Sequence, residues 1–395
     1  MLKKSQINQP YNNKLKFLQI LLIPLMLLGF EAISFLVSDT GLESNKISII
    51  YRVFFVLLCL LVIINHSIKK KIFSQNYILF IFWTLYLIRG FYDSTLNPES
   101  IKSMTLMFWL FAFFLSFIPM IALFASINFA TIIYAKKVFL ILAITVNVLS
   151  LVNNFTAISE GSLSRYMSNI IVNSVTYGQA GLALVIISFS YFISSLKTTK
   201  YIYLLFMLLG LVNLALAGSR GPVIELIFLI IFFIASNKNK FKFKYLIFLP
   251  LIFYGFFNKY DDFIKISNVL GRIESTNLEE ERVNIFLESW QRFTNNPIFG
   301  SRAIGEWAHN IFLGSLEALG IIGLILMIVI YRNAIKRAFV LAKFESTDWL
   351  ALLLVMQLVA ALISGAIWNS ITLWALIGLI SNLYYNRELY NDIKS

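Results

Sequence analysis

The residues best suited to chemistry lie in and beside one polar segment, residues 258–308, in a chain that is otherwise largely apolar. Four of the eleven arginines fall in this segment, and His309 and Asn310 follow it at the start of another apolar run. A guanidinium group presents its N–H groups in a plane that fits phosphate oxygens, and it keeps its charge when partly buried. A histidine exchanges a proton near neutral pH. The pattern predicts a site that binds an anion, a phosphate or a pyrophosphate, and moves a proton.

A second candidate lies upstream, in the turn that carries Ser219 and Arg220 between two apolar runs. Pro222 suits the first turn of the helix that follows. The free N–H groups at the start of that helix would point to the same place as Arg220, and such helix ends attract anions. The alternative is an ordinary tight hairpin with one arginine that extends to the membrane surface.

Three acidic residues, Glu31, Glu225 and Glu317, lie inside apolar runs, where ionisable groups are candidates for function. Glu317 follows His309 by eight residues, about two helical turns, so the two share one helix face. We expect Glu317 and Asn310 to support the site, Glu317 by pairing with an arginine or by orienting its neighbours. For Glu317 the alternative is a packing role, and for His309 it is a polar position at the membrane interface.

Several other chemistries lack their residues. The single cysteine, Cys59, lies in an apolar run, which excludes a disulfide within the chain and disfavours a thiol enzyme. No second histidine or cysteine stands near His309, so the sequence predicts neither a metal nor a cofactor. Asp261 and Asp262 could hold a divalent ion, although a solvated pair in a loop is the favoured interpretation. Serine-hydrolase, phosphate-loop and dinucleotide-binding patterns are absent.

The elements that must position these residues are membrane helices. The 395 residues are 59% hydrophobic and 13% charged, against about 25% charged residues in a typical soluble domain. This composition predicts an all-α polytopic membrane protein, a single integral domain over residues 1–395. Apolar runs that approach the roughly 20 residues needed to cross a bilayer predict about twelve transmembrane helices. They are 17–37, 49–66, 77–93, 104–124, 138–153, 171–193, 201–217, 222–235, 245–257, 309–331, 349–366 and 371–385.

The net charge of +13 follows topology and gives no indication of nucleic-acid binding. Lysine clusters fall in alternate loops, as expected for the cytoplasmic side of a membrane, and both termini share that side. The segment 258–308 then lies on the outer face as one large loop. The first apolar run has no small-residue cleavage site, so we interpret it as a helix rather than a removed signal peptide.

Residues 279–293 within the outer loop have apolar side chains at the spacing of an amphipathic helix. Such a helix would lie on the membrane surface or cover a cavity. Arg282 would sit beside its apolar stripe, at the membrane boundary. For Arg272 and Arg292 we favour pairing with the acids of the same loop. Asn295 to Pro297 should end the helix.

Three short motifs, in this order and spacing, resemble the bacterial O-antigen polymerase and O-antigen ligase superfamily. They are Asn296-Pro297-Ile298-Phe299-Gly300, His309-Asn310-Ile311-Phe312-Leu313 and Glu317-Ala318-Leu319-Gly320-Ile321-Ile322-Gly323. The turn Gly218 to Gly221 is similar to the Ser-Arg-Gly turn of that family. The number of spans, the cytoplasmic termini and the late periplasmic loop agree as well, so the resemblance covers most of the chain.

The resemblance implies a metal-independent, inverting glycosyltransferase of the polytopic GT-C type in the bacterial inner membrane. Its donor would be a glycan on undecaprenyl pyrophosphate, and its acceptor a sugar hydroxyl at the periplasmic face. Carried over by motif, Arg220 and Arg282 would bind the pyrophosphate, with Arg165 from an earlier loop. His309 would activate the acceptor hydroxyl or stabilise the departing pyrophosphate. Chain-length regulators, flippases and membrane lipids are the partners that this implies.

Alternatives remain open at this stage. A polymerase would join the glycan to a repeat unit on a second lipid carrier, and this activity is favoured by the turn at 218–222 and the run at 317–323. A ligase would transfer the glycan to the lipid A core. Outside the family, a lipid or glycan transporter is the rival class, and it should show more charges at mid-span and an internal repeat.

Overall fold

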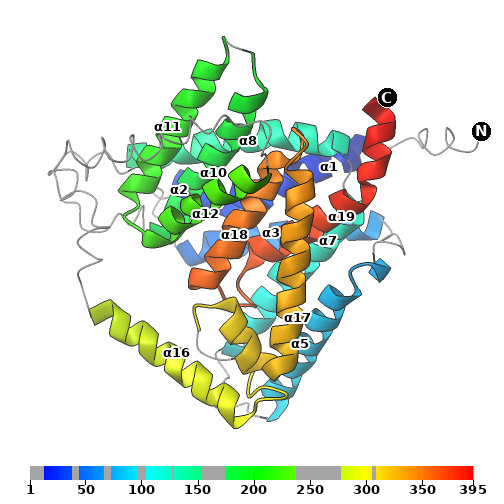
Figure 1. The fold of residues 1–395 in the computed structure, drawn as a ribbon, viewed down its shortest axis with the longest axis vertical. Helices are drawn as coiled ribbons and strands as arrows, with labels where there is room; N and C mark the ends of the chain where they lie inside the picture. The colour runs from blue at the N-terminus through cyan, green and yellow to red at the C-terminus, as the bar shows by residue number, and fades with distance from the viewer. Residues whose placement is uncertain are drawn as a thin grey trace, which may run out of the picture.

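The computed structural model describes residues 13–37, 44–65, 73–96, 104–126, 129–153, 174–196, 198–236, 277–304 and 308–394. All regular secondary structure in these ranges is helical, in agreement with the predicted fold class (Figure 1). The elements are α1 (Asn13–Pro24), η1 (Leu25–Gly29), α2 (Phe30–Val37), α3 (Ser44–Asn65), α5 (Tyr77–Leu96), η2 (Trp109–Phe117), α7 (Ile118–Ser126), α8 (Phe129–Asn153), α10 (Ser174–Ser194), α11 (Lys200–Leu216), α12 (Arg220–Ser236), α16 (Asn277–Asn295), α17 (Ile311–Leu341), α18 (Asp348–Ser364) and α19 (Ile371–Lys394).

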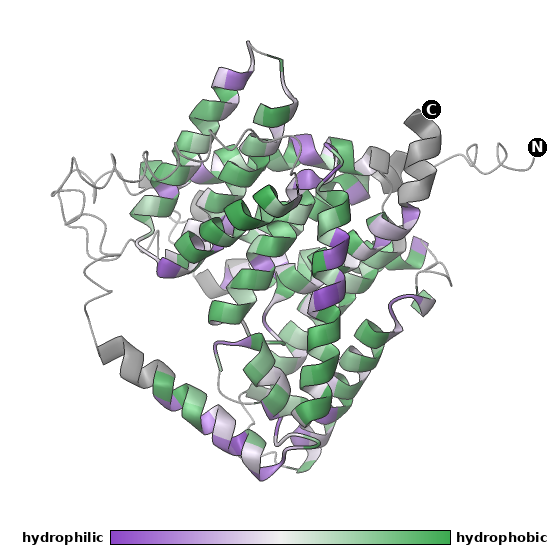
Figure 2. Cartoon of the chain, viewed as in Figure 1, coloured by the Kyte–Doolittle hydropathy of each residue, from purple (hydrophilic) through white to green (hydrophobic). Residues whose placement is uncertain are grey.

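Six apolar stretches among the described residues are long enough to cross a membrane, which identifies the chain as a membrane protein. They are Phe17–Ser34, Ser48–Asn65, Met104–Phe124, Thr131–Val152, Ser174–Ser194 and Ile311–Leu341. Apolar residues cover most of the helices in Figure 2, and α3 exposes large ones such as Ile50 and Ile64. Each predicted span coincides with a helix except 245–257, which lies outside the described residues.

The core is tied together by buried aromatic side chains of α5 and α19. Trp83 packs edge-to-face on Trp374 with ring centroids 5.0 Å apart, and both side chains are fully buried. Phe82 stacks on Trp374 and on Tyr86. The indole N–H of Trp374 donates to the carbonyl oxygen of Ile367 at 2.7 Å. This contact fixes the connection between α18 and α19 against the core.

Two apolar stretches contain π-helical segments, η1 and η2, where the helix takes one residue more per hydrogen-bonded turn. In η1 the carbonyl oxygen of Leu25 accepts a hydrogen bond of 2.6 Å from the hydroxyl of Tyr51 on α3. Segments of this kind are often found beside functional sites. Both contribute residues to a cavity of about 290 Å³, described below.

Two basic residues that the sequence analysis assigned to membrane topology are buried parts of the structure. The Lys136 ammonium group donates to Ser190 Oγ and to the Glu345 carbonyl oxygen, and lies 3.4 Å from the Asp348 carboxylate. Arg337 donates from Nη1 to Asn76 Oδ1 at 2.6 Å and also bonds Ser381 and Tyr385. Arg337 belongs to α17, which ends at Leu341 and so extends ten residues beyond the predicted span 309–331.

The amphipathic helix predicted at 279–293 is present as α16 and ends at Asn295, just before Asn296 and Pro297. It runs along one edge of the molecule, apart from most other helices, and meets the bundle near its C-terminal end (Figure 1). Its apolar side chains Val283, Phe286, Leu287 and Trp290 are each about half exposed. Residues 300–304 lead back into the bundle, where Ala303 and Ile304 are buried.

Candidate functional site

The start of α17 combines a cap with a strained backbone. Asn310 caps the helix, because its Oδ1 accepts hydrogen bonds of 2.9 and 3.0 Å from the N–H groups of Phe312 and Leu313. Its Nδ2 donates to the Leu362 carbonyl oxygen at 3.0 Å, which ties α17 to the end of α18. His309 precedes the cap with a φ of 52°, a left-handed conformation that is uncommon for residues other than glycine.

The first two turns of α17 end at a break that joins two of the sequence motifs. Gly320 has a φ of 62° and a ψ of −151°, so the N–H of Ile321 cannot reach Glu317. It donates instead to the Pro297 carbonyl oxygen at 2.9 Å. The Glu317 carbonyl oxygen, released by the break, accepts from the N–H groups of Ser301 and Arg302 at 2.8 and 3.2 Å. The loop after α16 and the start of α17 are therefore one hydrogen-bonded unit.

The two glycines allow this close approach. A Cβ at Gly320 would lie 2.6 Å from the Pro297 carbonyl oxygen, and a Cβ at Gly300 would lie 2.6 Å from the Ala318 carbonyl oxygen. Gly300 also has a positive φ, 72°. Both positions exclude a side chain because backbone atoms occupy its place.

A buried carboxylate lies at the centre of this unit. Glu317 Oε1 accepts from Arg292 Nη1 at 3.1 Å and from Arg302 Nε at 3.2 Å, and only 5% of the Glu317 side chain is exposed. Arg292 also pairs with Glu288 at 2.8 Å, as expected for an arginine that balances the acids of its own loop. Of the roles left open for Glu317, pairing with arginine is the one present. The carboxylate joins α16 and the following loop to α17.

Two side chains of helix α5, Arg89 and Asp93, also bind the loop after α16. Arg89 donates from Nε to Asp93 at 2.9 Å and from its Nη groups to the carbonyl oxygens of Gly300 and Ser301. Asp93 is buried and accepts from the N–H of Ala303. The sequence analysis did not identify Asp93 or its pairing with Arg89. The available signal was their spacing of four residues on one helix, which favours an ion pair.

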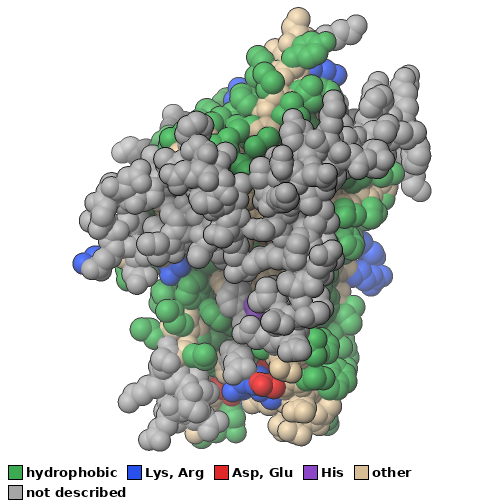
Figure 3. Space-filling model, turned by 90° about the vertical axis from the view of Figure 1, so that its left-hand side faces the viewer, with side chains coloured by type: hydrophobic (Ala, Val, Ile, Leu, Met, Phe, Trp, Pro, Cys, Tyr) green, Lys and Arg blue, Asp and Glu red, His purple; other side chains and the backbone are tan. Residues whose placement is uncertain are grey.

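A small cavity of about 30 Å³ lies between these elements. Glu317, Arg302 and Asn310 line it together with Tyr86 and the connection at 365–368. This volume suffices for a water molecule and is too small for a sugar. In Figure 3, acidic and basic side chains gather at the lower end of the molecule, and a histidine side chain lies above them. His309 is the one histidine within the described ranges.

The turn with Ser219 and Arg220, for which the sequence analysis predicted anion binding, lies at the start of α12. Arg220 is the first residue of this helix and is partly exposed, while Ser219 before it is buried. Pro222 lies in the first turn, as predicted, and fits against Gly178 of α10. Helix α12 packs on α18, whose last turn receives the Asn310 hydrogen bond. Helices α12 and α17 thus both pack on α18.

Two predicted site residues, Arg165 and Arg282, cannot be placed. Arg165 lies outside the described residues, as does Arg272, for which pairing with loop acids was predicted. Arg282 lies in the first turns of α16, where the structure describes the backbone but no side chains. The described residues contain no group of three or more acidic, histidine or cysteine side chains able to hold a metal ion.

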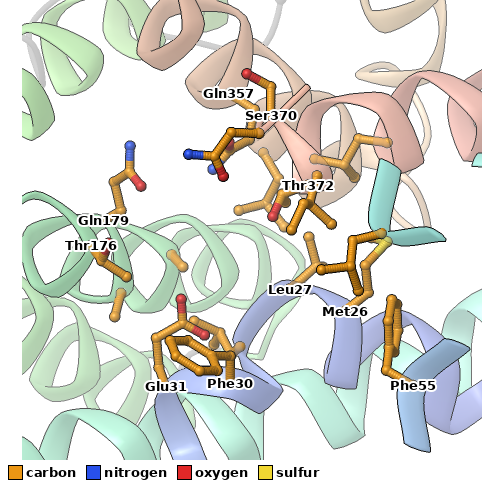
Figure 4. A pocket seen from close by; sticks show the side chains of 18 of the residues that line it. Met26, Leu27, Phe30, Glu31, Phe55, Thr176, Gln179, Gln357, Ser370 and Thr372 are labelled. Atoms are coloured by element: carbon orange, nitrogen blue, oxygen red, sulfur yellow. The ribbon is translucent and has the colours of Figure 1, made fainter. Parts of the chain in front are cut away.

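A second cavity, of about 290 Å³, lies among α2, α3, α10, α18 and α19. In Figure 4, Glu31 rises from α2 into the space below Gln357 and Thr372, and Thr176 and Gln179 come from α10. Gln179 Nε2 donates to Glu225 Oε1 at 2.9 Å, which connects this cavity to α12. The sequence analysis singled out Glu31 and Glu225 as ionisable groups at membrane depth. It did not predict that Gln179 would link the cavity lined by Glu31 to Glu225.

The comparisons with known proteins place this chain in no family. No protein-family model matches the sequence, and no curated protein matches it. A functional assignment therefore depends on the residues and their geometry.

Proposed function

We propose that this protein is a polytopic membrane glycosyltransferase. It transfers an oligosaccharide from undecaprenyl pyrophosphate to a sugar hydroxyl at the periplasmic face of the bacterial inner membrane. We favour the polymerase reaction, in which the acceptor is a repeat unit on a second lipid carrier. Transfer to the lipid A core, as in a ligase, is the alternative. Twelve spans, cytoplasmic termini and a periplasmic segment at 258–308 belong to this proposal.

The arrangement at the start of α17 is the observation that carries the proposal. Two motifs quoted for the family resemblance, 296–300 and 317–323, are joined there by the hydrogen bond from the Ile321 N–H to the Pro297 carbonyl oxygen, and the third motif, with His309, lies between them in the sequence. Separate motifs with no common purpose would have no reason to meet at one helix start. The left-handed backbone of His309 adds support, because strained residues concentrate at functional sites.

The reaction proceeds by inversion without a metal. The acceptor oxygen attacks the anomeric carbon of the donor sugar, and His309 takes the proton of that hydroxyl. The bond from this carbon to the pyrophosphate oxygen breaks, and the electron pair leaves with the lipid pyrophosphate. Arg220, at the positive end of α12, and Arg282 stabilise the charge that develops there. Arg165 would contribute from the earlier periplasmic loop.

A deletion strain tests this function directly through its surface polysaccharide. Loss of a polymerase leaves a single repeat unit on the lipid A core, whereas loss of a ligase leaves long chains on undecaprenyl pyrophosphate. Complementation with the wild-type gene should restore the normal ladder, and complementation with His309→Ala should not. An unchanged ladder, with every surface glycan of normal length and quantity, contradicts the proposal.

A further inference from the structure

The 290 Å³ cavity contains more polar groups than its depth in the protein would suggest. Its volume falls near the lower limit of about 300–1,000 Å³ for small-molecule sites. Helices α2, α3 and α10 supply lining residues from three of the stretches long enough to cross a membrane. The polar and charged lining residues besides Tyr51 are Glu31, Arg52, Thr176, Gln179, Gln357, Asn369, Ser370 and Thr372.

Three of these side chains, Arg52, Gln357 and Thr372, make no hydrogen bond to any described part of the chain, and the Glu31 carboxylate bonds only the backbone of its own residue. The Arg52 guanidinium instead lies over the rings of Phe111 and Phe30, 4.6 and 5.7 Å from their centroids. A buried donor or acceptor without a partner destabilises the folded protein. Arg52, Gln357 and Thr372 are only partly buried, so their polar groups line the cavity and are free to bind a polar ligand there.

The kind of ligand follows from the charges and donors. Arg52 and Glu31 balance each other, so the cavity does not favour a strongly anionic group such as pyrophosphate. A hydrocarbon chain would leave the polar side chains without partners. A sugar hydroxyl both donates and accepts, and so it can bond a carboxylate, a guanidinium, an amide and a hydroxyl in turn.

We propose that this cavity is a binding site for an uncharged sugar unit, separate from the pyrophosphate-binding residues. The proposal deepens the proposed function and rests on it for the source of the sugar, the glycan that the enzyme transfers or extends. Gln357 on α18 and Thr372 on α19 bind hydroxyl groups of the sugar. Glu31 on α2 accepts a hydrogen bond from the sugar, and Arg52 on α3 donates one. The cavity thereby selects a glycan by its hydroxyl pattern.

Saturation-transfer NMR on the purified full-length protein tests this site. The protein is reconstituted in lipid nanodiscs free of sugar-headed detergents. The probe is the neutral oligosaccharide released by mild acid from the strain's own surface polysaccharide. Gln357→Leu and Thr372→Val remove one hydrogen-bonding group each. Gln291→Leu and Thr145→Val make the same changes at exposed positions and serve as controls. Inorganic pyrophosphate is added as a competitor, and thermal unfolding is measured for every variant.

The wild type and the two controls should bind the oligosaccharide alike. Gln357→Leu and Thr372→Val should each weaken binding by about fivefold to tenfold, the effect of one hydrogen bond. Pyrophosphate should not displace the sugar. Equal binding by all correctly folded variants, displacement by pyrophosphate or no binding to the wild type would overturn the site. The proposed function fails separately, if the wild type transfers no glycan from its lipid-linked donor.

Discussion

Single residues at the start of α17 perform different tasks within a short stretch. His309 has the strained backbone, Asn310 caps the helix, and Glu317 receives two arginines. Asn310 and Glu317 therefore have clear structural roles at the start of α17. Of these three, His309 alone can exchange a proton near neutral pH while its neighbours fix its place.

Glu317→Gln should reduce thermal stability, because it removes a buried charge that balances Arg292 and Arg302. Hydrogen bonds to charged groups contribute about 1.5–3 kcal/mol, and a loss in this range is expected. The matched control is Glu288→Gln, an exposed partner of Arg292, whose effect should stay within about 1 kcal/mol. Thermal unfolding of the purified variants measures both. Equal effects of the two substitutions would show that Glu317 does not organise the cluster.

Residue-level predictions succeeded where the signal was local. The position of Asn310 at a helix start and the pairing of Arg292 with loop acids follow from neighbours in the sequence. The hydrogen bonds from Arg89 to Gly300 and Ser301 could not be predicted, because they join a side chain to backbone carbonyl oxygens more than 200 residues away. Every residue has a backbone carbonyl oxygen, so the sequence does not indicate which of them a distant arginine contacts.

At the scale of elements, the break in α17 is the feature that unites the site. A straight helix would use the Glu317 carbonyl oxygen for its own ladder and leave the N–H groups of Ser301 and Arg302 without that acceptor. The break at Gly320 exposes the Glu317 carbonyl oxygen, and the loop uses it. Helix α16 is thereby anchored at its C-terminal end, while its half-exposed apolar side chains remain available to the membrane surface.

Gly320→Ala should disrupt this unit. The new Cβ would meet the carbonyl oxygens of Pro297 and Ile298, and alanine disfavours a φ of 62°. We expect a loss of more than about 3 kcal/mol. Gly314→Ala is the control on the same helix, since its Cβ would have only ordinary contacts at 3.9 Å. It should raise the melting temperature slightly, by helix propensity. Similar melting temperatures for the two variants would contradict the interlocked arrangement.

Most elements could be predicted from apolar runs, and α16 from its helical periodicity. The sequence analysis ended the span that begins at residue 309 at residue 331, because Arg332, Lys336 and Arg337 interrupt the apolar run there. The structure continues α17 to Leu341, since Arg337 finds hydrogen-bond partners on neighbouring helices. The joining of 296–300 to 317–323 depends on backbone angles at two glycines, which residue spacing does not reveal.

For the whole molecule, an all-helical membrane protein was predictable from composition alone. The side of the membrane on which each end lies depends on the distribution of lysine and arginine. Buried Lys136 and Arg337 show that some of these basic residues also serve packing. The rest of the basic pattern still predicts opposite sides for the loop near Phe299 and the turn near Lys343.

Cysteine labelling tests this topology. In a Cys59→Ala background, Phe299→Cys and Lys343→Cys each place one thiol at an exposed position. A membrane-impermeant thiol reagent added to cells with a permeable outer membrane should label position 299 and leave position 343 unlabelled until the inner membrane is broken. The reverse pattern would invert the proposed orientation and remove the candidate site from the periplasm.

The most direct test of the central claim is glycan transfer by purified His309→Ala. The wild type and the variant are supplied with a lipid-linked oligosaccharide, and chain products are measured over time in the absence of added metal. General acid–base groups contribute about 10²–10⁴-fold, so transfer by the variant should fall by at least about 100-fold while its melting temperature stays near that of the wild type. Transfer at a rate close to the wild type would contradict the role of His309 and the site built around it.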